Sequence, residues 1–411
     1  METQPGSASA NAAFNQRPEK IALTVIFAIM LMDVVGISIL YPVSAYILRL
    51  YSSQALMVTM LSVVYSAAQF LAAPVLGKLS DRLGRRPVLL VSLLGSAAGY
   101  LIFGLGGALW ILFLSRLIDG VTGGNMSTAS AYIADVSKPE ELAKNLGLIG
   151  LAWGIGLVVG PALGGLFGQL DLRAPAFIAA ALTLLNLALG FFLLPESLPI
   201  EKRLASPIRS GDFVAFVSIR NMARVPGLGV LLVVLCLYNF GFNGMNSTET
   251  LFFIQKFTAQ PWQIGLLTML IGGTVAFVQM AFVQRLVSRF GENILATGCL
   301  LLQALGSLMT GLNPLFLLVY PIVIVRGAVG VSIFPALGAL NTSRVSASEL
   351  GILMGVTTSL GSLMGIFGPI LAGIVYDHVS PAGPYWLAAA LFAGAAFLLI
   401  GAEGSKLTKQ A

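Results

Sequence analysis

Residues 77–87 read GKLSDRLGRRP, and this short polar stretch lies between two strongly apolar ones. It holds four basic side chains and one carboxylate, Asp81. In a chain that crosses a membrane, so short a charged gap is a tight turn at the bilayer surface. Gly77 and Gly84 permit close helix approach or a positive φ, and Pro87 suits the first turn of the next helix. The stretch therefore predicts two membrane helices joined by a basic turn.

The composition is that of a membrane protein. Of the 411 residues, 57% are hydrophobic and only 10% are charged, whereas a soluble domain carries about 25% charged residues. Apolar runs long enough to span a bilayer, about 20 residues each, occur twelve times, at 20–43, 54–77, 87–107, 109–135, 143–168, 174–195, 225–254, 261–286, 292–312, 314–341, 349–377 and 383–403. The sequence therefore predicts an all-α polytopic membrane protein.

The basic residues indicate the orientation. With the N-terminus placed in the cytoplasm, eighteen of the 23 Lys and Arg residues fall in cytoplasmic segments and three in outer segments, while Arg116 and Arg326 lie within spans. The positive-inside rule then predicts that both termini are cytoplasmic. Since the net charge of +6 is scattered over many short loops, we expect no nucleic-acid partner.

The two halves of the chain repeat. Four pairs of residues recur at offsets of 206 to 210 positions, namely Asp33 with Asn239, Gly84 with Gly291, Arg116 with Arg326, and Gly160-Pro161 with Gly368-Pro369. Two pseudo-symmetric six-helix bundles are predicted, a plan that holds substrate at the bundle interface. The expected organisation is a tail at 1–19, a bundle at 20–195, a linker at 196–224, a second bundle at 225–403 and a tail at 404–411. Within the linker, residues 212–220 form an amphipathic piece that lies at the membrane interface or is plain linker.

Charged residues inside the first bundle are candidates for chemistry. Asp33 lies in the first span, where an ionised carboxylate is costly unless it is neutral, paired or functional. Burial and a nearby cation act on its charge in opposite directions, which is what a proton carrier needs. Asp119 shares a helix face with Arg116, so it is either a second protonation site or the local partner of Arg116.

The pattern G-x-L-S-D-R-x-G-R-R-P resembles the loop between helices 2 and 3 of the major facilitator superfamily, and the resemblance covers essentially the whole chain. It implies that Arg116 faces the same cavity as Asp33 and is its cation, with a static packing pair as the alternative. It also implies a charge cluster that latches the outward-facing state, with Asp81 facing the start of the eleventh helix near Leu350. The alternative is that these are solvated loop charges. The cluster residues are Gly77, Asp81, Arg82, Gly84, Arg85, Arg86 and Asp135.

A glycine pattern in the fifth span favours export. It resembles a motif of exporters that exchange substrate for protons, and it consists of Gly156, Gly160, Pro161, Gly164 and Gly165. Glycines four residues apart line one helix face and let a partner helix come close. Ordinary small-residue packing is the alternative interpretation.

Among drug/proton antiporters, the chain resembles the tetracycline-resistance exporter branch. Three polar positions of that branch fall on Gly99, Val275 and Gln303, so tetracycline itself is not the substrate that we expect. What remains is an apolar cavity with amides, which suits an amphiphilic molecule of low charge. Its expected lining is Tyr65, Gln69, Asn125, Asn239, Phe240, Asn243, Gln279 and Gln303.

These observations predict a proton-coupled drug exporter of the inner membrane that works by alternating access and confers antibiotic resistance. We expect it to act as a monomer in contact with lipids, with no cofactor or metal and with protons as the coupling ion. The alternatives are a nutrient symporter or uniporter and a membrane sensor or scaffold. No nucleophile–base arrangement or phosphate-binding loop was found in the sequence, which argues against an enzyme and against ATP-driven transport.

Overall fold

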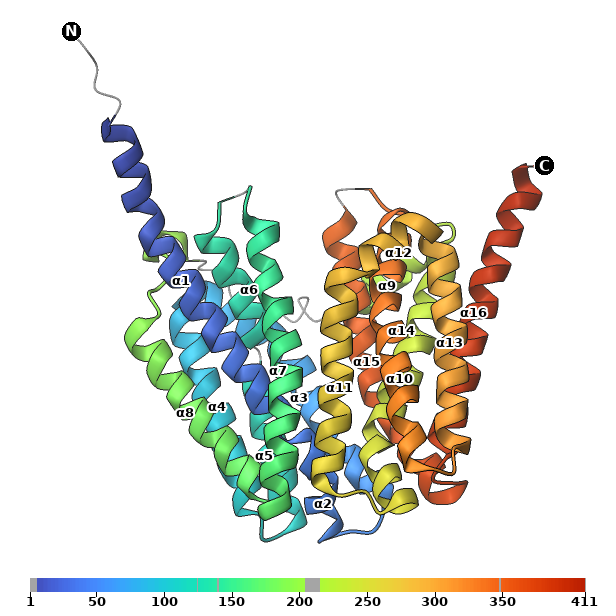
Figure 1. The fold of residues 1–411 in the computed structure, drawn as a ribbon. Coiled ribbons are helices and arrows are strands. Elements are labelled where there is room, and N and C mark those ends of the chain that lie inside the picture. The colour runs from blue at the N-terminus through green and yellow to red at the C-terminus, as the bar shows by residue number, and fades with distance from the viewer. Residues whose placement is uncertain (1–5, 124, 139, 204–214, 347–348, 411) are drawn as a thin grey trace.

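A computed structural model describes residues 6–410 apart from 124, 139, 204–214 and 347–348. Two helical bundles stand side by side (Figure 1). The first contains α1 (Gly6–Ser38), α2 (Tyr41–Arg49), α3 (Ala55–Leu83), α4 (Arg85–Leu105), α5 (Leu109–Thr122), α6 (Asn125–Val136), α7 (Leu142–Leu170) and α8 (Ala174–Leu193). After α9 (Ala215–Ala223), the second contains α10 (Leu228–Phe257), α11 (Pro261–Ala281), α12 (Val283–Phe290), α13 (Glu292–Leu312), α14 (Phe316–Thr342), α15 (Leu350–His378) and α16 (Gly383–Gln410).

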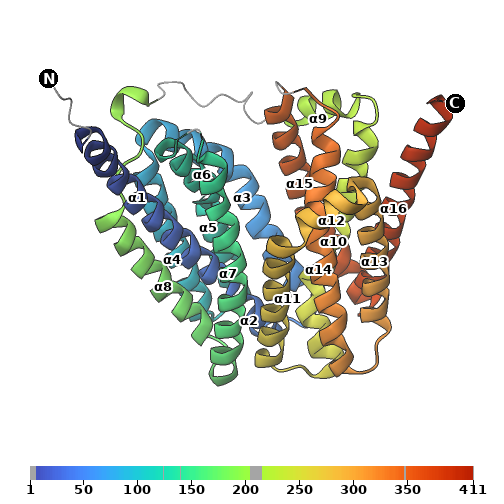
Figure 2. The same cartoon turned by 45° about the horizontal axis from the view of Figure 1, so that its top comes forward.

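The two ends of the bundles are distinct. The start of α1 and the end of α16 lie on the same side of the molecule (Figure 1), which we call the terminal face. The opposite side, where α2 lies, is called the α2 face. Seen from the tilted direction of Figure 2, the two bundles still lie side by side, with α7 and α11 between them.

Eleven of the twelve expected spans are helices long and apolar enough to cross a membrane, among the residues that the structure describes. The twelfth, expected at 109–135, is described in two parts: α5 ends at Thr122 and α6 begins at Asn125, and residue 124 between them is not described. The Gly123 carbonyl at this break accepts a hydrogen bond from the Gln69 side-chain amide at 2.8 Å. A backbone group freed inside a membrane needs such a partner. The all-α fold is confirmed.

The charged stretch at residues 77–87 is more helical than predicted. Helix α3 continues to Leu83 and α4 begins at Arg85, so Gly84 alone joins them. Its φ of +107° is a conformation that glycine adopts without strain. Gly291 joins α12 to α13 with a φ of +75° in the same way. The two halves therefore repeat at the position where the sequence offset placed them.

The helical segments also differ from the expected limits at the chain ends and in the linker. Helix α1 begins at Gly6, well inside the expected tail, and α16 continues to Gln410. Residues 212–214 of the expected amphipathic piece lie outside the described residues. Beyond them, Met222 of α9 is buried in a cluster with Leu228 and Leu353. The end of α9 is therefore held by α10 and α15 of the second bundle.

Large apolar side chains cover much of the outside of the molecule. Phe192, Met280 and Leu317 are each more than three-quarters exposed. Such residues are tolerated where the surrounding medium is lipid, while the backbone groups are paired within the helices. Together with the eleven apolar helices, they make this a multi-pass membrane protein.

The space around the glycines of α7 shows where the two bundles are in contact. A Cβ built on Gly165 would lie 2.8 Å from the Cα of Gly265 in α11, and one built on Gly154 would lie 3.3 Å from Ala276. Nearer the terminal face, a Cβ on Gly150 would have no described atom within 4 Å. Helices α7 and α11 thus touch near the α2 face and separate toward the terminal face.

The packing of α7 against α1 gives a first prediction. A Cβ on Gly160 would clash with the Ser38 side chain and lie 3.0 Å from the Val35 carbonyl oxygen. We expect Gly160→Ala to lower the free energy of unfolding by about 1–3 kcal/mol, the usual cost of overpacking. Thermal unfolding in detergent measures it as a lower Tm. Gly147→Ala is the control, because its Cβ would meet no described atom; equal Tm values for both variants would contradict the prediction.

Candidate functional site

The first buried polar contact joins α1 to α6. The Asp33 carboxylate accepts a hydrogen bond from the Asn125 side-chain amide at 3.1 Å. Both residues are less than a tenth exposed. The unpaired Asn125 Oδ1 is also buried, and it has no hydrogen-bond partner within the described residues. Asp33 is thus held by a neutral amide deep inside the first bundle.

Arg116 pairs with Asp119 rather than with Asp33. Its Nη1 lies 3.1 Å from Asp119 Oδ2, one turn along α5. No ion pair joins Arg116 to Asp33 among the described residues, so the role of Arg116 as the cation of Asp33 stays a prediction. The guanidinium also lies over aromatic rings, 4.8 Å from the centroid of Phe103 and 5.6 Å from that of Tyr100. Its Nε and Nη2 are buried without a hydrogen-bond partner among the described residues.

These contacts form one polar region. Tyr65 of α3 lies within electrostatic reach of both carboxylates and of the guanidinium, and the Asp119 charge also acts on Asp33. The Gln69 amide is 3.3 Å from the Tyr65 hydroxyl. Two carboxylates therefore share a region with one guanidinium, which leaves one negative charge uncompensated when both acids are ionised.

A second cluster is centred on Arg85, at the start of α4. Its guanidinium bonds the Asp81 carboxylate and lies 3.1 Å from Asp135 Oδ2 at the end of α6. It also donates to the Ser80 hydroxyl at 2.7 Å. The backbone N–H of Arg85 donates to Glu196 at 2.8 Å. The structure thus brings together the three charges expected here and adds Glu196, which sequence reasoning missed although it directly follows an apolar span.

The remaining residues of the expected latch are more peripheral. Arg82 is exposed, and a Cβ on Gly77 would meet no described atom. Arg86 donates to the Phe191 carbonyl of α8 and lies over its ring. Within the described residues, no hydrogen bond joins Asp81 to the start of α15. Among the described residues, the contacts of the cluster therefore lie within the first bundle and the start of the linker.

The glycine motif of α7 serves two partners. Gly156 and Gly160 face α1, where an added Cβ would clash with Val34 and Ser38. A Cβ on Gly164 would clash with the Ile39 carbonyl, directly after α1. The Ser38 hydroxyl donates to the Gly156 carbonyl at 3.0 Å. Gly165 instead faces α11, and a Cβ on Gly265 would lie 2.6 Å from the Pro161 carbonyl oxygen. The motif therefore packs α7 within its own bundle and across to the other one.

The α2 face is closed by contacts between the bundles. Asp377, at the end of α15, accepts hydrogen bonds from the backbone N–H groups of Ala55 at 2.8 Å and Leu56 at 2.9 Å. These are free N–H groups at the start of α3, whose own N-cap, Gln54, makes no side-chain cap. The Tyr46 hydroxyl donates to the Ala259 carbonyl just before α11. Both contacts join residues more than 200 positions apart.

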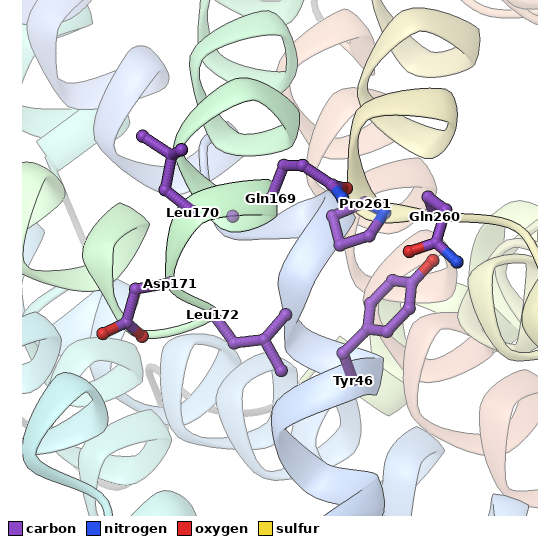
Figure 3. A pocket seen from close by; sticks show the side chains of 8 residues that line it. Tyr46, Gln169, Leu170, Asp171, Leu172, Gln260 and Pro261 are labelled. Carbon is purple, nitrogen blue, oxygen red and sulfur yellow. The ribbon is translucent and has the colours of Figure 1, made fainter.

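A small cavity of about 250 Å³ lies at this closed seam. Figure 3 shows Tyr46 beside Gln260 and Pro261, facing the end of α7 and the turn that follows it. Asp171 in that turn accepts a hydrogen bond from the Arg173 backbone N–H at 2.8 Å. The seam carboxylate Asp377 joins the two bundles, whereas the hydrogen bond of Asp171, among the described residues, lies within its own turn.

The residues that were expected to line a cavity in the second bundle do not all lie together. Asn239 and Asn243 each donate to a backbone carbonyl one turn earlier in α10, and Phe240 lies beside Gly368 of α15. Gln279 is exposed near the end of α11. Gln303 lies apart from them: it is 1% exposed, and a Cβ on Gly330 would lie 3.8 Å from its amide nitrogen.

The family model of the Major Facilitator Superfamily matches residues 25–293 and 231–410, which together cover most of the chain. The chain belongs to the major facilitator superfamily. It is 35% identical to the tetracycline resistance protein, class C, of Escherichia coli, over 92% of this chain and 95% of that protein. It is 27% identical to multidrug resistance protein 2 of Bacillus subtilis (strain 168), over 86% of this chain and 89% of that protein.

Two solved transporter structures match this fold. The crystal structure of the human organic anion transporter MFSD10 (TETRAN) gives a TM-score of 0.69 at 27% identity and covers 93% of this chain and 99% of that one. A bacterial homologue of the lysosomal transporter Spinster, in an inward-facing and occupied conformation, gives 0.71 at 14% identity over 92% and 94%. The protein is therefore a membrane transporter of the major facilitator superfamily and not an enzyme.

This major facilitator protein holds a second buried ion pair, which sequence reasoning missed. Arg326 Nη1 of α14 lies 3.2 Å from Glu249 Oε1 of α10, and the Arg326 side chain is only 6% exposed. Its guanidinium also contacts the Thr310 hydroxyl at 3.4 Å and the Met245 sulfur at 3.0 Å. The signal in the sequence was a single glutamate in an apolar run, with a single arginine in another run of the same half.

This pair gives a second prediction. Removing one partner of a buried ion pair leaves an unpaired charge, which costs about 3–5 kcal/mol. We expect Arg326→Met to destabilise the protein strongly, and the double variant Arg326→Met with Glu249→Gln to recover most of that loss. Thermal unfolding of the two single variants and the double variant in detergent measures this. A double variant less stable than Arg326→Met alone would refute it.

Proposed function

We propose that this protein is a proton-coupled exporter of amphiphilic small molecules, with drugs such as antibiotics among them. Support comes from the names of its relatives, which include tetracycline resistance and multidrug resistance proteins. The observation that carries the proposal is the buried region in which two carboxylates, Asp33 and Asp119, accompany the single guanidinium of Arg116. In a medium that solvates charge poorly, the excess acid favours binding of one proton. Protons are the only coupling species that the proposal requires.

Asp33 is proposed as the proton carrier. Asp119 already has the guanidinium as its partner, whereas Asp33 has only a neutral amide. Protonation of Asp33 removes the uncompensated charge, and loss of that proton restores it. In the proposed cycle, the ionised form attracts the two unpartnered nitrogens of Arg116, and this shift alters the polar lining at Tyr65 and Gln69 that holds substrate.

We propose that the membrane is the inner membrane and that the terminal face is cytoplasmic. The orientation is proposed because most Lys and Arg residues fall in loops that the sequence places on the same side as the two termini. The bundles separate toward that face, as the glycines of α7 record, so the conformation is inward-facing. In the proposed cycle, units 20–195 and 225–403 rock about the seam as a monomer surrounded by lipid. The Arg85 cluster then meets the start of α15 in the outward-facing state.

The proton carrier is tested in proteoliposomes that contain a pH-sensitive dye. With ethidium, an amphiphilic drug, added as the substrate, the wild-type protein should move protons against the substrate. We expect Asp33→Asn to lower this substrate-driven proton movement at least tenfold, because its side chain cannot exchange a proton, while substrate–substrate exchange continues. Asp171→Asn is the matched control, since that carboxylate bonds only its own turn.

Proton movement at the wild-type rate in Asp33→Asn would overturn this assignment. The direction of transport separates export from the alternative of nutrient uptake by symport or uniport. Substrate that accumulates on the same side as an imposed proton influx would favour uptake. Substrate that leaves as protons enter favours the exporter.

In the proposed alternating access, Asp377 stabilises one of the two conformations. By capping the free N–H groups of α3 from the other bundle, this carboxylate stabilises the form that is closed at the α2 face, because an anion at a helix N-terminus is favourable. Loss of an N-cap costs typically about 1 kcal/mol. We expect Asp377→Ala to shift the ratio of inward-facing to outward-facing molecules about fivefold toward the outward-facing form.

Spin-label distances between exposed positions 50 and 262 at the α2 face measure that ratio. The expected result for Asp377→Ala is a larger fraction of long distances than in the wild type. Asp171→Ala, which removes a carboxylate on the same face but within one bundle, should leave the distribution unchanged. Identical distributions in all three proteins would show that the cap does not hold the closed form.

A further inference from the structure

The side chain of Asn125 contacts the proposed proton carrier directly. Asn125 is the first residue of α6, and its Nδ2 donates to Asp33 Oδ1 on α1 at 3.1 Å. Asp33 keeps 8% of its surface exposed, so a proton can reach it, whereas Asn125 is 4% exposed. The contact therefore joins a buried amide of one helix to an acid of another that is not fully enclosed.

The other end of the Asn125 amide has no partner. Its Oδ1 is buried and accepts no hydrogen bond within the described part of the chain. Buried polar atoms are nearly always hydrogen-bonded in folded proteins, so an unpartnered one needs an explanation. Because this oxygen is closed off from solvent, neither bulk water nor a bound molecule supplies the partner in this conformation. The partner has to be a group that the amide already contacts.

The chemistry of the two side chains provides that explanation. An ionised carboxylate only accepts hydrogen bonds, whereas a carboxylic acid also donates one. A primary amide carries a donor and an acceptor of nearly the same shape, so a half-turn of the group exchanges them. After such a turn, Asn125 would accept a hydrogen bond from protonated Asp33 at the place where it now donates. Since Oδ1 has no other partner, the half-turn breaks no hydrogen bond at the far end of the amide.

Two other buried amides bond groups that do not titrate. Asn186 of α8 donates to the Ile29 carbonyl of α1 at 2.9 Å, one turn before Asp33, and its Oδ1 likewise has no partner among the described residues. Asn239, which corresponds to Asp33 in the second half, donates to a backbone carbonyl of its own helix at 2.9 Å. A backbone carbonyl accepts at every pH. Of these three amides, Asn125 is the one whose partner changes from acceptor to donor.

The charged groups around this contact give Asp33 no direct cation among the described residues. Arg116 pairs with Asp119 at 3.1 Å. Asp119, Tyr65 of α3 and Tyr100 of α4 lie within electrostatic reach of Asp33. The other titratable side chains on the helices packed against α1 are Tyr132 and Asp135 of α6 and Lys144 of α7, and α8 has none. The neutral amide of Asn125 is therefore the direct contact that can respond to the proton.

We infer that Asn125 is a positioning residue for Asp33, which donates to the ionised carboxylate and turns its amide to accept from the carboxylic acid. The inference rests on the proposed function, because it takes Asp33 as the proton carrier. It explains how α1 and α6 stay joined in both states, so that a proton can bind and leave without breaking the contact. A hydrogen bond to a charged group is stronger than one to a neutral group, so Asn125 favours the ionised form on balance.

Infrared spectroscopy of the full-length protein in nanodiscs tests this role. The readout is the C=O stretching band of protonated Asp33, assigned by its absence in Asp33→Asn and followed as the pH is varied. Asn125→Leu removes the amide at similar volume, and we expect its titration midpoint to move about one unit toward alkaline pH, a tenfold change in proton affinity. Asn186→Leu is the matched control, because it removes a buried amide that bonds α1 but not the carboxylate; it should titrate like the wild type.

A second variant and a second band keep the test decisive. Asn125→Asp is isosteric and places two carboxyl groups in contact, which share one proton, so the protonated band should persist to more alkaline pH than in the wild type. The side-chain amide band that either variant loses should change in the wild type at the same midpoint as the carboxyl band. A wild-type midpoint in both Asn125 variants, or an amide band that does not change with pH, would overturn the inference.

The spectra are recorded without substrate or a proton gradient, which separates this inference from the proposed function. If the midpoint moves as expected while Asp33→Asn still moves protons at the wild-type rate, Asn125 positions an acid that titrates but is not the carrier. If Asp33→Asn abolishes proton movement but both Asn125 variants titrate like the wild type, the carrier is retained and the role of Asn125 is refuted.

Discussion

The structure depends on holding a few charges in a medium that solvates them poorly. In the first bundle, Asp33 and Asp119 share one buried region with Arg116, and only Asp119 contacts the guanidinium. An ionised group placed toward lipid would be costly, so each of these side chains must turn inward. That requirement fixes how α1 and α5 are rotated about their axes. The remaining faces of these helices then pack against apolar neighbours or face the lipid.

The seam between the bundles combines two kinds of contact. Glycine-lined backbone at Gly165 and Gly265 gives close approach without side chains, and such a surface can separate and rejoin at little cost in rearranged rotamers. Asp377 adds a directional contact at the same end, because it bonds free N–H groups that have no other cap. A glycine-lined interface with a single side-chain hydrogen-bonding group is suited to two bundles that separate and rejoin repeatedly.

Much of the fold could be predicted from the sequence, because apolar length and basic loops report spans directly. The meeting of Arg85 with Asp135 was also predictable, since both lie at the same end of neighbouring spans. The hydrogen bond between Asp33 and Asn125 could not be predicted, because it depends on how the helices are rotated about their axes. Asp119, by contrast, lies one turn from Arg116 on the same helix and is within reach of it whatever that rotation. Glu249 was missed because comparison of the two halves gives it no charged counterpart. Whether Gln303 lines a cavity could not be predicted from its polarity, because a polar residue in a span can also face its own bundle.

The ion pair of Arg326 with Glu249 has an electrical consequence. Its two charges lie 3.2 Å apart, so this pair forms a compact dipole and adds no net charge to the interior of the second bundle. A membrane potential exerts about 2.3 kcal/mol per elementary charge for each 100 mV, but it acts only weakly on such a dipole. In the proposed proton-coupled cycle, we therefore expect a membrane potential to act mainly on the first bundle, where Asp33 and Asp119 outnumber Arg116.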